Sequence, residues 1–326
     1  MGAQWSQFFP PKPQFTEADV PSQDGKVFLI TGGASGIGFE LTKMLYGKNA
    51  RVYIAGRSQA KAEKAIKDIQ TTLTASTTGS LHFLHLDLDD LSSIKATVEA
   101  FKAKESKLHI LWNNAGVSRP ALGSVSKQGI ELQLATNCLG PFLLTQLLLP
   151  LLQAASSDES VVPGSVRVVW TASQVIELSA PFGGLVMSEL HNPPRDSSRL
   201  YTNSKTGNWF LASELARREG PTHGIISVAL NPGAASSSLF RHTPSVNYLA
   251  WPLLHKPRQA ALTELYAGLS EDIGLETNGC YVIPWGRIST NMRQDLVDAT
   301  KSMEDGGLGR AIKFWDFCVQ KTEQYL

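Results

Sequence analysis

Residues 27–45 read VFLITGGASGIGFELTKML and place three local patterns in series. The first four residues are apolar, as in a buried strand, and the apolar side chains of the last seven recur with helical spacing. Glycine occupies four of the seven positions between Thr31 and Phe39. This order of strand, glycine turn and helix is the one that a dinucleotide-binding turn requires.

The glycine turn predicts where a phosphate group would bind. Glycine lets the backbone turn sharply and approach a pyrophosphate, whose negative charge then lies at the positive end of the following helix. The spacing from Gly32 is Gly-x-x-x-Gly-x-Gly, which differs from the common Gly-x-Gly-x-x-Gly pattern. The predicted cofactor-binding residues of this turn are Gly32, Ser35, Gly36, Ile37 and Gly38.

The second predicted strand, residues 51–55, indicates which form of the cofactor would bind. In such folds an acidic residue at the end of this strand accepts hydrogen bonds from the ribose hydroxyls of NAD. Here Gly56, Arg57 and Ser58 follow the strand, and none of them is acidic. The guanidinium group of Arg57 suits a 2′-phosphate, which favours NADP over NAD. The alternative is that Arg57 is a solvated loop charge.

The third predicted strand, residues 81–86, ends at Asp87. Asp87 and Leu88 would lie at the carboxyl edge of the sheet, where we expect them to meet the adenine ring. Alternatively, the Asp87 carboxylate caps the helix that follows, a role that Asp89 or Asp90 also suits.

Strands and helices alternate along most of the chain. Further strands are predicted at residues 108–112, 166–170, 225–230 and 280–283, and helices at 58–72, 199–219 and 259–269 and around Asn137. This alternation predicts an α/β fold, a single Rossmann-type doubly wound parallel sheet of about seven strands with helices on both faces. The predicted parts are an N-terminal arm (1–24), an NAD(P)-binding domain (25–290) with a substrate lid near 234–258, and a C-terminal extension (291–326).

Tyr201 and Lys205 are four residues apart in one of these predicted helices, so their side chains emerge on the same face. A phenol is a poor acid or base at neutral pH because its pKa is near 10. A nearby ammonium group favours the phenolate and lowers that pKa, so the pair can transfer protons. Taken alone, Tyr-x-x-x-Lys is more often an ordinary helix surface.

Together these motifs resemble those of the short-chain dehydrogenase/reductase family over about residues 25–285. They occur in the family's order, and the joint match is far more specific than any single motif. The likeness is greatest to members related to retinol dehydrogenases and to fungal reductases of secondary metabolism. The residues that carry it are Thr31-Gly32, Gly36-Ile37-Gly38, Asn114-Ala115-Gly116, Asn137, Ser173, Tyr201, Lys205 and Pro232-Gly233.

The resemblance implies four catalytic residues for the interconversion of a carbonyl and an alcohol. Tyr201 would be the general acid in reduction or the base in oxidation, and Lys205 would lower its pKa and bind the nicotinamide ribose. Ser173 would hold the substrate oxygen. Asn137 would steady a water that connects Lys205 to solvent. Alternatively, Asn137 satisfies a neighbouring carbonyl and Ser173 caps the end of a strand.

The resemblance also implies further contacts to the cofactor, which would supply the hydride. Asn114 and Gly116 would line the adenosine side, although Asn114 also suits a structural tie between strands. The nicotinamide carboxamide would contact the backbone at Pro232, Gly233 and Ala235, and the pyrophosphate would lie near Ser237.

Residues 239–253 are rich in apolar and aromatic side chains, as in a lid over a substrate, and predict a medium-sized apolar carbonyl or alcohol. Packing of these aromatics onto the domain is the alternative. We therefore expect an NADP-dependent oxidoreductase. Two other functions could use the same residues: a cofactor-binding scaffold or redox sensor, and a non-redox dehydration, epimerisation or cyclisation.

Composition argues against several other classes. The formal net charge of +1 over 326 residues gives no electrostatic attraction to nucleic acid. Cys138, Cys280 and Cys318 form neither a disulfide framework nor a metal-ligand motif, so we expect no metal and a reducing, cytoplasmic setting. No segment has the roughly 20 apolar residues of a membrane span, and residues 141–155 are predicted to form a buried helix.

The two ends of the chain leave alternatives open. Residues 1–6, MGAQWS, match the pattern for acylation of Gly2, whereas the aromatic residues and prolines that follow also suit an extended arm packed on the domain. By resemblance, a homodimer or tetramer would form through the helices that contain Asn137 and Tyr201. The loop inserted between Ser173 and Tyr201, the lid and the C-terminal extension could instead block those faces and leave a monomer.

Overall fold

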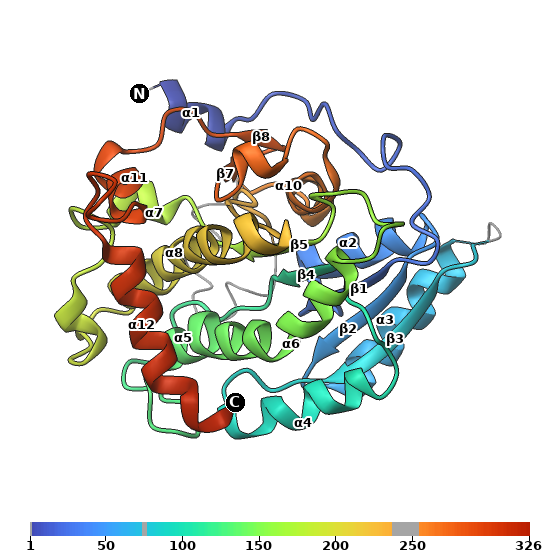
Figure 1. Cartoon of the computed structure of the whole chain (residues 1–326), viewed down its shortest axis with the longest axis horizontal. Helices are drawn as coiled ribbons and strands as arrows, with labels where there is room; N and C mark the ends of the chain where they lie inside the picture. Colours follow the sequence, from blue (N-terminus) through green and yellow to red (C-terminus); the bar gives the residue numbers. More distant parts are fainter. Residues whose placement is uncertain (1, 74–76, 237–253) are drawn as a thin grey trace.

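The computed structural model of the protein describes residues 2–73, 77–236 and 254–326. They contain an 8-stranded sheet in the order β3-β2-β1-β4-β5-β6-β7-β8 (Figure 1). β8 pairs antiparallel with β7, and all other pairs are parallel. The strands are β1 (Val27–Thr31), β2 (Arg51–Gly56), β3 (Ser80–His85), β4 (Ile110–Asn113), β5 (Arg167–Thr171), β6 (Ile226–Leu230), β7 (Tyr281–Ile283) and β8 (Arg287–Ile288).

Helices cover both faces of the sheet, because successive residues of the buried strands point to opposite sides. Leu29 belongs to the core on one face, whereas Phe28 and Ile30 belong to the core on the other. The first face is covered by α4 (Leu91–Lys102), α6 (Gly140–Ser156) and α8 (Ser197–His223), and the second by α2 (Gly36–Tyr46), α3 (Gln59–Thr72) and α10 (Pro257–Leu269). The predicted doubly wound fold is confirmed, with one antiparallel strand added at its edge.

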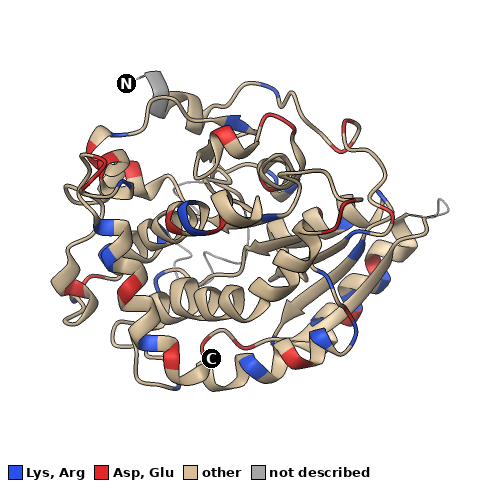
Figure 2. Cartoon of the chain, in the orientation of Figure 1, with Lys and Arg blue, Asp and Glu red and all other residues tan. Residues whose placement is uncertain are grey.

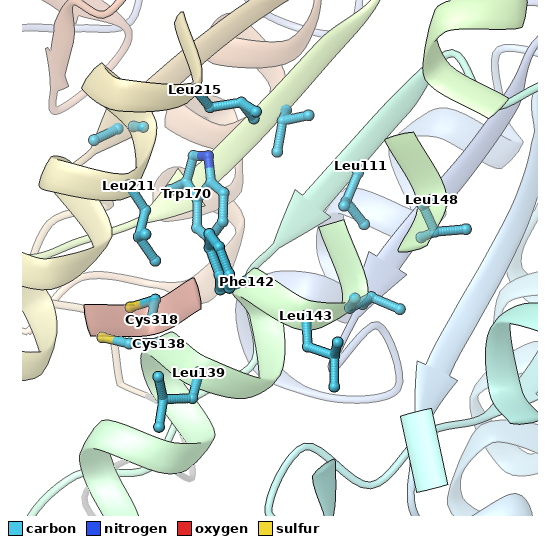
Figure 3. Close-up of a cluster of buried hydrophobic side chains, with 14 of the residues drawn as sticks. Leu111, Cys138, Leu139, Phe142, Leu143, Leu148, Trp170, Leu211, Leu215 and Cys318 are labelled. Atoms are coloured by element: carbon cyan, nitrogen blue, oxygen red, sulfur yellow. The ribbon is translucent and has the colours of Figure 1, made fainter. Parts of the chain in front are cut away.

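The long apolar helix is part of the core. It begins with α5 (Leu132–Leu134) and the π-helical turn η1 (Ala135–Leu139) and continues as α6. Within the described ranges, Leu132–Ser156 is the helix long and apolar enough to cross a membrane, but 61% of its apolar window is buried in the fold. Its side chains Leu139, Phe142 and Leu143 point into the cluster drawn in Figure 3. The predicted buried helix is therefore confirmed.

The C-terminal extension packs on the helices that carry the candidate catalytic residues. It contains α11 (Gln294–Thr300) and α12 (Arg310–Thr322), and α12 contacts both α8 and η1 (Figure 1). The fit is close, since a Cβ at Gly207 would lie 2.6 Å from the Phe314 ring and 2.8 Å from the Cys138 sulfur. Cys138 and Cys318, far apart in sequence, lie side by side as free thiols (Figure 3).

The N-terminal arm begins with a helix, α1 (Gly2–Phe8), where the sequence predicted an extended segment throughout. The arm does pack on the domain. The carbonyl oxygen of Phe8 lies 3.0 Å from Nε2 of His255, and that of Ser6 accepts a 2.9 Å bond from Arg287. The part of the chain that the structure describes also contains the short helices α7 (Val175–Ser179), η2 (Met187–Leu190), η5 (Leu275–Thr277) and η6 (Glu323–Tyr325).

Charged residues of both signs are interspersed along the helices (Figure 2). Several form short-range pairs, such as Lys64 with Asp68 at 2.6 Å and Lys102 with Glu99 at 3.1 Å. Such pairs along exposed helix faces contribute little to stability but keep opposite charges mixed. In this view, positions of both signs alternate along the described helices and loops.

Candidate active site

The glycine turn lies where the strand order reverses around β1, the place where α/β sheets bind ligands. Gly32 and Gly36 have φ angles of 71° and 56°, which glycine adopts without strain. A Cβ at Gly38 would lie 2.5 Å from the Gly32 carbonyl oxygen, so only glycine allows this approach of α2 to the turn. Ser35 is the N-cap of α2, and its side chain makes no capping hydrogen bond. The helix start can therefore accept a phosphate.

Asn114 ties β4 to the turn. Its side-chain amide donates a 2.8 Å hydrogen bond to the carbonyl oxygen of Thr31. The Thr31 hydroxyl accepts a 2.9 Å bond from the Ala115 N–H and donates one of 3.2 Å to the Trp112 carbonyl. Asn114 thus has the structural role that the sequence left open for it, and it lies beside the predicted cofactor crevice.

Gly116 and Asn137 connect that crevice to the catalytic helix. A Cβ at Gly116 would lie 3.1 Å from Asn137 Oδ1 and 3.5 Å from Lys205 Nζ. Asn137 accepts a 2.8 Å bond from the N–H of Val117, and its Nδ2 donates 2.9 Å bonds to the Val117 carbonyl and to Ser204 Oγ. Asn137 therefore satisfies a neighbouring carbonyl, as the alternative stated, and also lies next to the catalytic ammonium.

Tyr201 and Lys205 lie on one face of α8 and are almost completely buried. Nζ of Lys205 lies 5.9 Å from the centre of the Tyr201 ring and donates a 2.7 Å bond to the carbonyl oxygen of Thr171. Thr171 ends β5, and half-buried Ser173 follows two residues later, within hydrogen-bonding reach of Tyr201. The structure thus brings Ser173, Tyr201, Lys205 and Asn137 together.

Burial dominates the protonation of this pair. It raises the pKa of Tyr201 to about 12, against the lowering effects of the Arg119 guanidinium and the Ser173 hydrogen bond. It also lowers the pKa of Lys205 to about 8. The lowered Tyr201 pKa that the Tyr-x-x-x-Lys spacing predicts is therefore wrong here, because spacing contains no information about burial. The cation that opposes the rise is Arg119.

Arg57 lies near the glycine turn. Ala55 pairs with Thr31, and its carbonyl oxygen accepts a 2.8 Å bond from the Gly32 N–H, so β2 ends beside the turn. Nη1 of Arg57 is 3.4 Å from Asp89 Oδ2, and the Arg57 side chain is 60% exposed. Arg57 is thus a solvent-facing cation held loosely at the predicted 2′-phosphate position.

Asp90 caps α4, with its carboxylate accepting a 3.2 Å bond from the Ser92 N–H. The capping alternative for Asp87 is therefore wrong. The Asp87 carboxylate accepts a long 3.4 Å bond from the Asp89 N–H. Leu88 is buried, and Asp87 stays at the sheet edge, where the adenine contact remains a prediction.

The segment Pro232–Ala235 follows β6 at the same edge. Ala235 packs with Trp285, and Ile37 of the glycine turn packs against this pair. The segment therefore lies beside the turn, as a nicotinamide contact would require. Ser237 and most of the predicted lid lie outside the described residues.

Two site residues carry no sequence motif. Arg119, three residues after Gly116, has its guanidinium carbon 5.4 Å from the centre of the Tyr201 ring. Gln7 comes from α1: its amide donates a 2.5 Å bond to Glu177 and accepts one of 2.9 Å from Asn231, just before Pro232. The position of Arg119 beside the Asn-Ala-Gly motif was the one available signal for it. Sequence offers none for Gln7.

Known proteins resemble this chain along its length. Residues 26–180 match the family described as short chain dehydrogenase. Short-chain dehydrogenase/reductase iacJ of Pestalotiopsis fici is 44% identical over 99% of this chain and 98% of its own. A short-chain dehydrogenase/reductase of Phomopsis amygdali is 42% identical over 99% of this chain and 97% of its own.

Solved structures agree in fold. An uncharacterized protein of Mycobacterium paratuberculosis is 28% identical with a TM-score of 0.68, covering 95% of this chain and 97% of its own. Pseudomonas aeruginosa RhlG, solved as an NADP active-site complex, is 24% identical with a TM-score of 0.61, covering 80% of this chain and 95% of its own. By its sequence relatives and its assembled site, the chain belongs to the short-chain dehydrogenase/reductase family of oxidoreductases.

Proposed function

We propose that this protein is an NADP-dependent reductase that converts a carbonyl group to an alcohol. The observation that carries the proposal is the position of buried Tyr201 and Lys205 next to half-buried Ser173 at the carboxyl edge of the sheet. A proton donor, an ammonium group and a hydroxyl there are the groups that carbonyl reduction needs from the protein.

The residues at the sheet edge fit a dinucleotide. The missing Cβ of Gly38 lets α2 start directly against the glycine turn, and the helix start and the turn together would hold a pyrophosphate. Lys205 would bind the nicotinamide ribose, and Arg57 the 2′-phosphate. When bound, the cofactor supplies the hydride. RhlG was solved with NADP and a Brucella melitensis 3-ketoacyl reductase with NADH, so the preference for NADP rests on Arg57.

Tyr201 would donate its phenolic proton to the substrate oxygen as the alcohol forms. Its pKa of about 12 keeps the phenol protonated at neutral pH, so the proton is present although the phenol is a weak acid. The alkoxide that hydride transfer leaves on the substrate is a stronger base than a phenolate and takes this proton. Ser173 would hydrogen-bond to the same oxygen. Lys205, with a pKa near 8, keeps most of its positive charge at pH 7.

The setting is part of the proposal. Similarity over the whole chain to fungal short-chain dehydrogenase/reductases supports a role in fungal secondary metabolism. We further propose a cytoplasmic setting, which the three free cysteines favour. The apolar residues predicted for the lid favour a medium-sized, mainly apolar carbonyl substrate.

Calorimetric titration with NADPH and NADH tests the cofactor. We expect NADPH to bind at least about tenfold more tightly than NADH, because Arg57 adds charge-assisted hydrogen bonds to the phosphate. Arg57→Ala should abolish the difference, whereas Lys64→Ala, which removes another exposed cation, should leave it. Equal binding of both cofactors by the wild type would remove Arg57 from its assigned role.

Consumption of NADPH with a panel of apolar ketones tests the reaction. Tyr201→Phe should bind NADPH like the wild type and lose at least about a hundredfold in turnover, since proton transfer is lost. A variant that keeps full turnover would refute Tyr201 as the acid. Binding of neither cofactor would favour a function without redox chemistry.

A further inference from the structure

The loop after Gly116 places a guanidinium group against the catalytic phenol. The Arg119 guanidinium carbon lies 5.4 Å from the centre of the Tyr201 ring, on a half-buried side chain. Lys205 lies 5.9 Å from the same centre. The Tyr201 ring therefore has two cations near it, and only Lys205 belongs to the recognised catalytic set.

The structure holds Arg119 in place. Its backbone has a φ of 47°, a left-handed conformation that is uncommon outside glycine. Its N–H donates a 2.8 Å bond to Oε1 of the buried side chain Gln133, which itself bonds to the backbone at Ser197. Nε donates a 3.1 Å bond to Ser198 Oγ at the start of α8. These contacts fix the loop and one edge of the guanidinium group.

The other edge of this guanidinium group has no acceptor. Within the described ranges, no carboxylate lies within 4.0 Å of Arg119, and Nη1 and Nη2 donate no hydrogen bond. Other half-buried arginines differ: Arg199 pairs with Glu189 at 2.9 Å, and Arg293 with Asp295 at 2.8 Å. This edge of the guanidinium group is exposed beside the catalytic ring and is therefore free to bind an anionic group that enters the site.

We propose that Arg119 binds an anionic oxygen group of the substrate, a carboxylate or an ionised enol or phenol, on the same molecule as the carbonyl that Tyr201 protonates. This inference rests on the proposed function and narrows it to an otherwise apolar acid. The planar fork of Nη1 and Nη2 matches a carboxylate with two parallel hydrogen bonds. Because the guanidinium lies beside the Tyr201 ring, the anionic group and the carbonyl are separated by only a few bonds.

Matched acids and esters test this assignment. The NADPH complex is titrated with 2-, 3- and 4-acetylbenzoate and with their methyl esters, which have the same carbonyl but no charge. We expect at least one acid to bind about tenfold or more tightly than its ester, the usual strength of a charge-assisted hydrogen bond. Arg119→Gln should abolish the preference, and Arg119→Lys should retain part of it, since it keeps the charge but not the fork.

The control is Arg195→Gln, which removes an exposed arginine just before α8 and should leave the preference unchanged. Unaltered NADPH binding by Arg119→Gln verifies its fold. Three results would each overturn the proposal. They are equal binding of acids and esters by the wild type, no binding of any acid, and a preference for the acid that survives Arg119→Gln. If the protein reduces ketones but does not prefer acids, the Arg119 proposal fails and the reductase assignment stands. If acids bind through Arg119 but no NADPH is consumed, the reductase assignment fails and the binding role of Arg119 stands.

Discussion

The hydroxyl of Thr171 donates a 2.7 Å hydrogen bond to Glu264, while the carbonyl oxygen of the same residue accepts one of 2.7 Å from Lys205. Thr171 thus links the catalytic ammonium to a carboxyl group on α10, in the helix layer on the other face of the sheet. Glu264 is fully buried, and in the described part of the chain its Oε2 has no hydrogen-bond partner. Burial raises the pKa of Glu264 to about 7, although Thr171 and Lys205 favour the ionised form.

This contact predicts a loss of stability with rising pH. The Glu264 pKa is raised from 4.5 to about 7 in the folded state, so between these values the folded protein binds the proton more tightly than the unfolded chain does. The free energy of unfolding should therefore fall across this window, by about 3 kcal/mol for the full shift. Urea unfolding at several pH values between about 5 and 8 measures the slope.

Glu264→Gln should remove most of that slope, since the amide keeps the Thr171 contact and does not titrate. Glu271→Gln removes an exposed acid two residues after the same helix and should leave the slope as it is. An unchanged slope in Glu264→Gln would show that another group causes the pH dependence.

Local patterns predicted the fold and the four residues at the centre of the site. The Tyr201–Lys205 spacing defines one helix face, and the glycine turn defines a strand-to-helix connection, so both follow from neighbouring residues alone. Arg119, Glu264 and Gln7 reach the site through loop conformation and packing between distant segments, which one sequence does not display. The same reason explains the error on the Tyr201 pKa, which depends on burial rather than on spacing.

Removal of the Arg119 charge should shift the pH dependence of alcohol oxidation. Oxidation needs the Tyr201 phenolate, so its rate rises with pH towards the pKa of Tyr201. The Arg119 cation lowers that pKa, so Arg119→Gln should move the rising limb to higher pH. Initial rates of NADP reduction, with the alcohol of any ketone that the enzyme reduces, measure the shift. The pH profile of Arg119→Lys should stay near that of the wild type. Coincident profiles for Arg119→Gln and the wild type would contradict the electrostatic role of Arg119.

Gln7 should matter to stability and to substrate binding, although it lies near the chain terminus. Gln7→Ala leaves buried groups of Glu177 and Asn231 without their partner, which costs about 1–3 kcal/mol. Because Asn231 also accepts the Gly233 N–H at 2.9 Å, the loop after β6 should loosen and KM should rise more than kcat falls. Urea unfolding and steady-state kinetics check both effects, with Gln14→Ala, an exposed glutamine of the same arm, as the control. If Gln7→Ala has the stability and kinetics of the wild type, the Gln7 contacts of α1 contribute neither to stability nor to substrate binding.

The C-terminal helix should keep the protein monomeric. α12 covers η1 and the face of α8 through which related enzymes are expected to associate, and its Phe314 is fully buried against Gly207. Phe314→Ala should therefore cost about 3–5 kcal/mol of unfolding free energy, whereas Phe9→Ala, at a half-exposed ring, should cost far less. Light scattering after gel filtration should give the 35.4 kDa of one chain for the wild type. A mass twice as large, in a protein whose Phe314 stays buried, would place the dimer interface on a different face. A dimer formed through α8 requires α12 to leave the surface of α8.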